Sequence, residues 1–423
     1  MLKRLLALVL PVLCVTGLAG CGLLPPATPD APEGPTRGAV GLPYQFTAVT
    51  TSPGNHDVCY RFDWGDGSCS GWSRFLPPGE PVTAWHAWSA PGRYDIRVQA
   101  ANVIGLKSGW SPALTIAIAG PAGFPDTLIA TVPVGGDPTD IAVRPDGAYL
   151  YVANELVPEL TVVRVRDRQV VARVPCGRCP WMVSVSPDGR WVYVSNATDG
   201  TVTVIAAADL SVAATVPVGA SPCGACFSPD GSRTYVTSQH DNSVTVLRTS
   251  DHTVIATVPV GATPRDLDIL PGGNYLYVVN LYGGNLTKVR VADHAPVATI
   301  PLPFAGHRVL ALPGGEELYV SEYHGSRVAV VSVAEDRVVA VFESGPSVIG
   351  LCPLGEYALA AICGENAVAV VRTADREVVG RVAVGAGPYS VCAPADRGFA
   401  ATCDRHARTV SLVGYRPVIA ERH

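Results

Sequence analysis

The sequence LIATVPVG at residues 128–135 decides the fold, because altered copies of it return through the rest of the chain. Related octets start at residues 170, 212, 254, 296, 338 and 378, which gives a repeat of about 42 residues. A second marker, the turn PDG at residues 145–147, returns at six further prolines: Pro187, Pro229, Pro271, Pro313, Pro353 and Pro394. Two independent markers therefore agree on seven repeats.

Each repeat holds four short runs with the residue pattern of β-strands, as at residues 140–143, 149–154, 161–165 and the octet itself. Four antiparallel strands in a unit of this length are typical of a propeller blade, and the closed ring leaves few exposed sheet edges. The sequence therefore predicts an all-β chain with a seven-bladed β-propeller over residues 127–423. An eighth, truncated octet lies at residues 418–421, but we expect the intact strand at 128–134 to complete the last blade.

The second strand of each repeat carries a recognisable motif, such as YLYVVN at residues 275–280. With LYVAN at 150–154 and WVYVSN at 191–196, this motif resembles the YVTN repeat of bacterial and archaeal surface-layer-like propellers. The resemblance extends from about residue 127 to the C-terminus and implies a role in cell-surface architecture and binding, with no shared reaction. Blades six and seven depart from the motif at residues 359–362 and 399–402, so we expect their upper surface to differ.

Residues 38–119 have the alternating pattern of a smaller, Ig-like β-sandwich. The segments YRFDWGDGS at 60–68, HAW at 86–88 and PGRY at 91–94 resemble PKD domains of surface proteins, which implies a spacer or interaction module. A carboxylate pair beside glycine, Asp63 and Asp66, is expected to form a turn and not a Ca²⁺ site. Five tryptophans are expected to serve mainly the core, with glycan binding as the alternative: Trp64, Trp72, Trp85, Trp88 and Trp110.

The N-terminus predicts export. Residues 1–20 carry Lys3 and Arg4 before an apolar stretch, as a signal peptide does. The sequence LAGC at 18–21 resembles the lipobox of bacterial lipoproteins, which implies a lipid on Cys21; an ordinary secretory signal is the alternative. Residues 21–37 are proline-rich and are predicted to be an extended tether, and residues 120–126 a linker. We therefore expect a protein anchored by lipid to the bacterial cell envelope, at either membrane.

The charge balance excludes one class of partner. The chain has 31 Lys+Arg against 36 Asp+Glu, a formal net charge of -5. Such a chain is not built to hold nucleic acid through its phosphates. The expected partners are the membrane, through the N-terminal lipid, and a protein or another envelope component, with a glycan among the alternatives.

Alignment of the repeats on the turn proline selects one position, six residues before it, at the mouth of the central channel. Neighbours such as Gly135, Gly219 and Gly261 are nearly identical between repeats. The position six before the proline instead differs in every blade: Thr139, Trp181, Cys223, Arg265, His307, Ser347 and Tyr389. Arg265 offers a fork for a carboxylate or phosphate, and Trp181 and Tyr389 offer stacking faces. The alternative is that these are loop positions without a constraint.

Loops after the second strand are expected to face the same way. They carry histidines and acids that we expect to be solvated and not to bind metal: Glu155, Asp199, His240, Asp241, Glu322, His324, Asp404 and His406.

Ten cysteines remain beyond Cys14 and Cys21, and an even number in an exported chain favours disulfides. Cys59 is expected to pair with Cys69. Cys352 and Cys363 would lie about 20 Å apart along their hairpin, too far for a disulfide, and Cys392 and Cys403 share their spacing. We therefore expect pairing between blades, Cys352 with Cys392 and Cys363 with Cys403. Two CxxC pairs leave a four-thiolate zinc site as a weaker alternative: Cys176, Cys179, Cys223 and Cys226.

No sequence motif of a hydrolase nucleophile, a P-loop or a zinc protease occurs. We favour a non-catalytic, lipid-anchored binding or scaffold protein that presents the top face of its propeller to a macromolecular or envelope partner. One alternative is a lactonase-like hydrolase or lyase that uses Arg265 and His307 with a loop acid. Another is a periplasmic accessory or sensor that binds a small anion. No cofactor is predicted.

Overall fold

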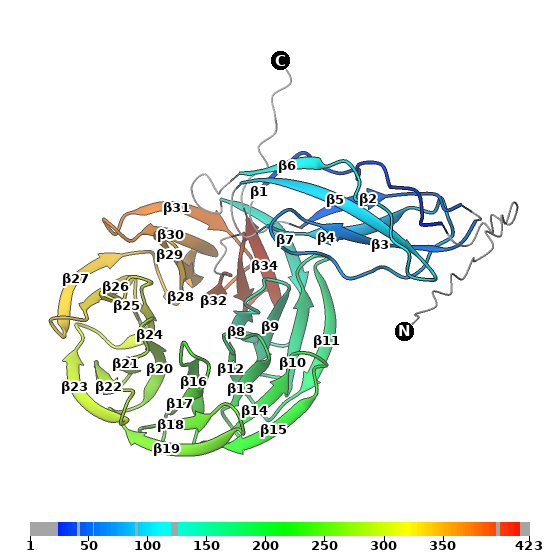
Figure 1. Ribbon diagram of the computed structural model, residues 1–423. Coiled ribbons are helices and arrows are strands. Elements are labelled where there is room, and N and C mark those ends of the chain that lie inside the picture. Colours follow the sequence, from blue (N-terminus) through cyan, green and yellow to red (C-terminus); the bar gives the residue numbers. More distant parts are fainter. Residues whose placement is uncertain are drawn as a thin grey trace, which may run out of the picture. The chain divides into compact units, whose positions relative to one another are not determined.

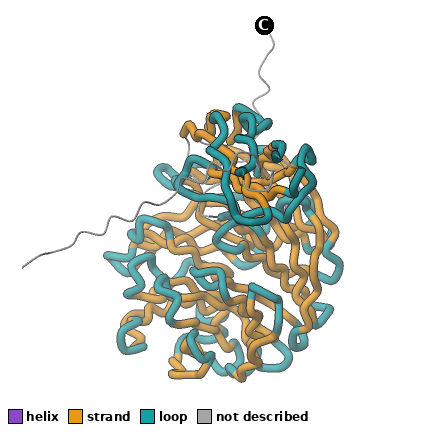
Figure 2. Tube along the Cα trace, turned by 45° about the vertical axis from the view of Figure 1, so that its right-hand side comes forward, coloured by secondary structure: helices purple, strands orange, loops and turns teal. Residues whose placement is uncertain are grey.

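The computed structural model describes residues 24–39, 43–53, 55–88, 92–119, 126–394 and 398–414. The chain divides into two compact units, whose main parts are Pro43–Ala119 and Gly120–His423. Strands make up most of both units (Figure 2). No helix among these residues has the length and apolar character needed to cross a membrane. The predicted signal peptide, Cys21 and the truncated octet at 418–421 lie outside the described residues.

The first unit is a small β-sandwich (Figure 1). A four-stranded sheet in the order β1-β6-β5-β3 is accompanied by the two-stranded sheet β2-β4. Aromatic side chains fill its core, with Trp88 stacked on Tyr94 and Trp64 stacked on Phe62. The strands are β1 (Arg37–Ala39), β2 (Tyr44–Ala48), β3 (Val58–Asp63), β4 (Val82–His86), β5 (Gly92–Asn102) and β6 (Leu114–Ala119).

The prediction of a free tether is wrong for residues 24–37. The amide of Ala27 donates to the carbonyl of Thr51 at 3.0 Å, and Glu33 and Thr47 exchange two backbone hydrogen bonds of 2.8 Å. Three prolines are buried: Pro26, Pro29 and Pro32. Proline is tolerated along a sheet edge, and its ring is apolar, so a proline-rich segment can pack where it needs few donors.

The second unit is a ring of seven four-stranded antiparallel sheets (Figure 1). The first strand of each blade lies nearest the axis and contacts the first strand of its neighbours. The strands of blades one to three are β8 (Pro138–Val143), β9 (Tyr149–Asn154), β10 (Glu159–Arg164), β11 (Gln169–Pro175), β12 (Pro180–Val185), β13 (Trp191–Asn196), β14 (Thr201–Ala206), β15 (Val212–Pro217), β16 (Pro222–Phe227), β17 (Arg233–Ser238), β18 (Ser243–Arg248) and β19 (Thr253–Pro259).

Blades four to seven continue the pattern, with one short 3-10 helix, η1 (Cys363–Glu365), after β29. Their strands are β20 (Pro264–Ile269), β21 (Tyr275–Asn280), β22 (Asn285–Arg290), β23 (Ala295–Pro301), β24 (Gly306–Ala311), β25 (Glu317–Glu322), β26 (Arg327–Ser332), β27 (Arg337–Glu343), β28 (Val348–Leu354), β29 (Tyr357–Ile362), β30 (Ala367–Arg372), β31 (Val378–Ala383), β32 (Pro388–Cys392), β33 (Ala400–Asp404) and β34 (Thr409–Gly414).

The ring is closed by the strand at its N-terminal side. β7 (Thr127–Pro133) forms the outer strand of blade seven and pairs with β34, with Pro133 opposite Thr409 and Thr127 opposite Gly414. The prediction that the intact octet completes the last blade is confirmed. Because β7 comes first in the sequence and β34 last, one sheet joins the two ends of the propeller.

In blades one, two and four the second strand ends in an asparagine that holds it to the third strand. The amide nitrogen of Asn196 donates to the hydroxyl of Thr203 at 2.9 Å, and Asn280 makes the same contact with Thr287 at 2.9 Å. In blade seven Asp404 stands at this position and accepts from three hydroxyls, including that of Ser411 at 2.6 Å. The motif therefore ties the second strand to the third.

Carboxylates on the innermost strands connect one blade to the next. Asp140 Oδ2 accepts from the amide of Val183 at 3.0 Å, and Asp268 Oδ2 accepts from the amide of Ala311 at 2.8 Å. Burial raises the pKa of Asp268 to about 7, although the hydrogen bonds that its carboxylate accepts from backbone amides oppose this shift. Asp268 therefore keeps its proton at pH values at which an ordinary aspartate is ionised.

Blade six departs from the predicted register. Pro353 pairs with Ala358 inside the β28–β29 hairpin, and Leu354 pairs with Tyr357, so the turn consists of Gly355 and Glu356. In blade two, by contrast, the proline lies in the turn and the amide of Gly189 donates to the carbonyl of Ser186 at 2.8 Å. The proline is therefore not an equivalent marker in blade six.

The predicted disulfides are not formed, because all ten cysteines of the described residues are free. A backbone bridge places Cys69 opposite Asp63, four residues along β3 from Cys59, or roughly 13 Å at the usual rise per residue. A disulfide needs Cα atoms within about 7 Å. The pairing of Cys59 with Cys69 is therefore wrong.

The pairs expected between blades are not formed either. Cys352 and Cys392 occupy equivalent places on β28 and β32, but both are free. Cys363 begins the helix η1 beyond the end of β29, whereas Cys403 is buried within β33. The last two residues do not stand at equivalent positions of their blades, which removes the basis for pairing them.

Candidate functional site

The second residue of each innermost strand forms the mouth of the central channel. Six of the seven sequence-predicted residues stand there: Thr139, Trp181, Cys223, Arg265, His307 and Tyr389. In blade six Val348 pairs with Ile362 as Pro138 pairs with Asn154, so Ile349 takes the position assigned to Ser347. Ser347 precedes the strand with a φ of 54°, as Ser221 does in blade three.

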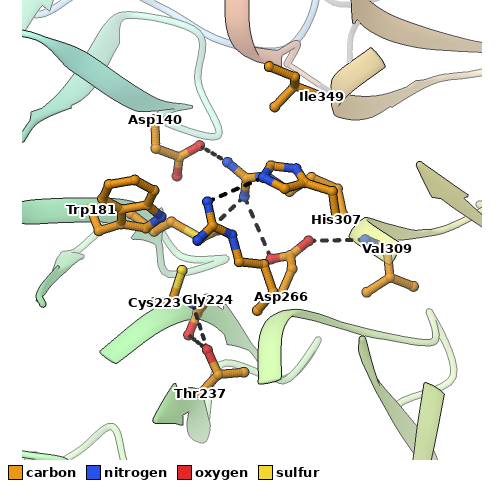
Figure 3. A network of polar contacts seen from close by, with 12 residues as sticks. Asp140, Trp181, Cys223, Gly224, Thr237, Asp266, His307, Val309 and Ile349 are labelled. Atoms are coloured by element: carbon orange, nitrogen blue, oxygen red, sulfur yellow. Dashed lines mark hydrogen bonds and ion pairs between the residues drawn. The ribbon is translucent and has the colours of Figure 1, made fainter. Parts of the chain in front are cut away.

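Three of these residues converge on a fourth, Arg265. Its Nη2 donates to the hydroxyl of Tyr389 at 3.2 Å and lies 3.3 Å from Nε2 of His307. Its guanidinium carbon lies 4.9 Å from the ring centre of Trp181. Figure 3 shows Trp181 and His307 within one network of polar contacts. Blades two, four, five and seven thus contribute to one cluster, and Thr139 does not join it, since its hydroxyl donates to the carbonyl of Trp181 at 2.8 Å.

Arg308 was not predicted to be a site residue, but it contacts side chains of three other blades. It is largely buried, and its Nη2 donates to Asp140 Oδ1 at 2.9 Å, while Nη1 lies 3.6 Å from Asp266 Oδ1 and 3.3 Å from the sulfur of Met182. These partners belong to blades one, four and two. Arg308 therefore bridges the channel and closes it beside Arg265.

A signal for this bridge exists in the sequence. Arg308 and its two carboxylates each follow a mouth residue by one position. This next position also varies around the ring, although Asp and Gly each occur twice: Asp140, Met182, Gly224, Asp266, Arg308, Gly350 and Ser390. The same search for divergence, applied one residue further along, would have selected Arg308 as a candidate, but not its pairing with Asp140 and Asp266.

The electrostatics of the cluster favour a neutral His307 beside two permanent cations. Burial and then the guanidinium groups of Arg265 and Arg308 hold the pKa of His307 well below its ordinary value. Burial raises the pKa of Asp266, and the neighbouring Arg308 opposes this rise. Because arginine stays protonated, His307 accepts a hydrogen bond from Arg265 through Nε2.

A third arginine at the mouth is fully paired. Arg405 Nε donates to Asp137 Oδ2 at 2.9 Å, and its Nη2 also donates to Glu155. Its guanidinium carbon lies 5.2 Å from the ring centre of Tyr389. Arg405 and Arg308 therefore each face two carboxylates, whereas Arg265 faces none among the described residues.

An open pocket of about 820 Å³ extends from the cluster over blades two and three. Trp181, Cys223 and Arg265 form its inner wall, and Gln239, His240 and several backbone segments complete it. Its volume lies within the usual range of small-molecule sites. The pocket gives a ligand access to the guanidinium group of Arg265.

The zinc alternative is not supported. No group of three or more His, Cys, Asp or Glu side chains in the described part of the chain is placed to hold a metal ion. Cys223 lines the pocket, whereas Cys226 packs with the core between blades three and four, and Cys176 packs between blades one and two. The loop acids also have partners: Asp199 pairs with Arg178 at 2.6 Å.

Comparison with known proteins agrees with both units. Residues 121–213 match the family described as lactonase, 7-bladed beta-propeller, and residues 30–112 match the PKD domain. The chain is a β-propeller protein with a PKD domain. The lactonase match falls on the first two blades and includes Trp181 but neither Arg265 nor His307.

Solved structures of two other proteins share the fold. The Kuenenia stuttgartiensis hydrazine synthase is 21% identical with a TM-score of 0.60, and the alignment covers 66% of this chain and 95% of that one. The structure of U3-55K is 12% identical with a TM-score of 0.60, and covers 69% and 99%. At these identities the likeness shows the fold alone. The comparison with curated proteins finds no match.

Proposed function

We propose that this protein is a non-catalytic binding protein of the cell envelope, whose propeller takes an anionic group of its ligand into the mouth of the channel. The observation that carries the proposal is the state of Arg265. This partly buried guanidinium has aromatic and histidine neighbours but no carboxylate partner among the described residues.

The contrast with the other two arginines supports this proposal. Arg308 and Arg405 each have two carboxylates, which offset the cost of removing a cation from water. Arg265 lies close enough to Arg308 for the two charges to oppose each other. A carboxylate or phosphate bound to Arg265 would relieve this repulsion and match the planar fork of its donors.

The setting of the ligand follows from the sequence. The lipobox-like LAGC at residues 18–21 supports export and a lipid anchor at Cys21, so the pocket would open outside the cytoplasm. The partner is then an envelope component or a macromolecule that carries an anionic group. Trp181 supplies a flat apolar wall beside the cation, which suits a ligand with a ring or an aliphatic face next to its charge.

Titration calorimetry of the full chain in detergent tests the proposal, with citrate, glucuronate and inorganic phosphate as probes. At least one probe should bind. Arg265→Gln should weaken its affinity about 10- to 100-fold, which is the usual loss when a hydrogen bond to a charged group is removed. Arg190→Gln is the matched control, because the Arg190 side chain is 77% exposed and Asp188 is its one ion-pair partner among the described residues. No heat with any probe, or an equal loss in both variants, would contradict the proposal.

A second candidate, lactone hydrolysis, is favoured by the family match over residues 121–213. It would use Arg265 to stabilise a developing oxyanion and His307 as a base. The Nε2 atom of His307 already accepts a hydrogen bond from Arg265, so its lone pair is not free to take a proton from water. Turnover of gluconolactone by the native chain, lost in both Arg265→Ala and His307→Ala, would favour this candidate over a non-catalytic role.

A further inference from the structure

The sandwich exposes two tryptophans at one face of its larger sheet. Trp72 is 38% exposed and Trp110 is 37% exposed, whereas Trp64 and Trp88 are 3% and 0% exposed. Tyr60 and Phe62 on β3 point into the core, so Arg61 between them points to the outer side. The exposed tryptophans are thus separate from the aromatic core.

A cation accompanies each exposed indole. Lys107 Nζ lies 5.6 Å from the ring centre of Trp72, and the guanidinium carbon of Arg61 lies 5.9 Å from the ring centre of Trp110. Arg61 pairs across the sheet with Gln99, and Lys107 bridges to Ala101, two residues further along β5. Successive residues of a strand alternate sides, so both cations lie on the same face.

These two cations have no carboxylate partner among the described residues. Arg61 Nη2 donates only to the sulfur of Cys69, at 3.1 Å, and Arg61 Nε is buried without a hydrogen-bond partner. A side chain with donors left over is suited to an acceptor from outside the chain. The four side chains Arg61, Trp72, Lys107 and Trp110 form what we name the Trp–cation face.

We propose that the Trp–cation face binds an acidic polysaccharide, with sugar rings covering the indoles and carboxylates pairing with Arg61 and Lys107. A flat sugar ring presents apolar C–H groups that suit an exposed indole. A neutral glycan would leave both cations unpaired, which charge complementarity disfavours. This proposal does not depend on the function of the propeller.

Affinity electrophoresis of the full chain in detergent tests this proposal, with polygalacturonate or alginate in the gel and amylose as the neutral polymer. The native chain should be retarded by an acidic polymer and not by amylose. The Trp72→Ala, Trp110→Ala double variant and the Arg61→Gln, Lys107→Gln double variant should each bind at least tenfold more weakly. Raising NaCl from about 0.05 M to about 0.5 M should also release the polymer, because exposed charges are screened.

Trp85→Ala is the control, because Trp85 is 50% exposed but belongs to β4 of the other sheet. It should leave retardation unchanged. Circular dichroism melting of each variant reports whether the sandwich is folded. No retardation of the native chain by either acidic polymer, or equal retardation of the native chain and both folded double variants, would overturn the proposal. Retardation by amylose that the cation variants retain would overturn the acidic class.

Discussion

The channel mouth and the Trp–cation face use the same pair of groups, an arginine or lysine beside an indole, in opposite surroundings. In the propeller, Arg265 lies 4.9 Å from Trp181 within a cluster of partly or fully buried side chains. In the sandwich, Lys107 lies 5.6 Å from Trp72, whose ring is 38% exposed. A charge held away from water interacts strongly and is poorly screened, whereas an exposed one is weak and sensitive to salt.

The largest expected effect tests the buried side of this contrast. Arg308→Met removes the cation between Asp140 and Asp266 and leaves both carboxylates without it, so the free energy of unfolding should fall by about 3–5 kcal/mol. Denaturant titration measures this loss. Adding Asp140→Asn and Asp266→Asn should recover most of the lost free energy of unfolding. Arg61→Met on the sandwich should lower the free energy of unfolding by less than about 1 kcal/mol. Equal losses at Arg308 and Arg61 would break the comparison.

Two carboxylates, Asp268 in the propeller and Asp66 in the sandwich, should make stability depend on pH in opposite directions. The pKa of Asp268 is raised to about 7, so the folded state holds a proton that the unfolded state releases near its ordinary value of 3.8. Stability from this group is therefore lost as the pH rises, by about 2–3 kcal/mol between pH 5 and pH 8. Asp268→Asn should remove this loss, as measured by urea titration at both pH values.

Asp66 in the sandwich is the counterpart with the opposite sign. Burial opposes its ionisation, but hydrogen bonds from Ser68 and His86 lower the pKa of Asp66 below its ordinary value. Its stabilising contribution is present above that ordinary value and is lost as the pH falls through the lowered one. Asp66→Asn should therefore leave the difference between pH 5 and pH 8 unchanged. A change equal to that of Asp268→Asn would refute this assignment.

Removing the unpaired cation should have a smaller, stabilising effect. The partly buried guanidinium group of Arg265 lacks a carboxylate partner among the described residues, and Arg265→Met replaces it with an apolar side chain of similar length. The free energy of unfolding should therefore rise by about 1 kcal/mol. The same variant should lose anion binding in calorimetry. A marked destabilisation would show that Arg265 serves the fold and not a ligand.

The smallest expected effect concerns the reactivity of the cysteine thiols in the two units. Cys69 of the sandwich is exposed, whereas Cys392 and Cys403 of the propeller are buried, and burial raises the pKa of both buried thiols. Brief treatment of the folded chain with iodoacetamide should therefore modify Cys69 first. Peptide mass spectrometry locates the label. Early labelling at Cys392 or Cys403 would show that the inner strands of blade seven open readily.

The sequence was sufficient to predict the ring, because octets, turns and the YVTN-like strand recur in register. The same repetition identified Arg265, His307, Trp181 and Tyr389, which the structure brings together. A repeat-based prediction fails where one blade changes its local geometry. In blade six the hairpin shortens, Pro353 moves into the strand, and Ile349 replaces Ser347 at the mouth.

Contacts across the ring could not be predicted in this way. Arg308 and Asp140 are far apart in sequence and meet only because the ring closes, so no local spacing announces their pair. The cysteine pairings failed because sequence spacing did not give the register. Cys69 lies opposite Asp63, and Cys363 lies beyond the end of β29. Burial of the proline-rich residues 24–37 likewise depends on a surface formed later in the chain.

The β7–β34 sheet has a consequence for biogenesis. During synthesis β7 leads the propeller, while its hydrogen-bonding partner is the final strand of the ring. An apolar strand with an open edge must therefore wait, unpaired, until every intervening blade has emerged, and such an edge is prone to associate with other chains. Premature termination within blade seven would leave this edge permanently open, so truncated chains should be recognised by aggregation or proteolysis before any loss of ligand binding is apparent.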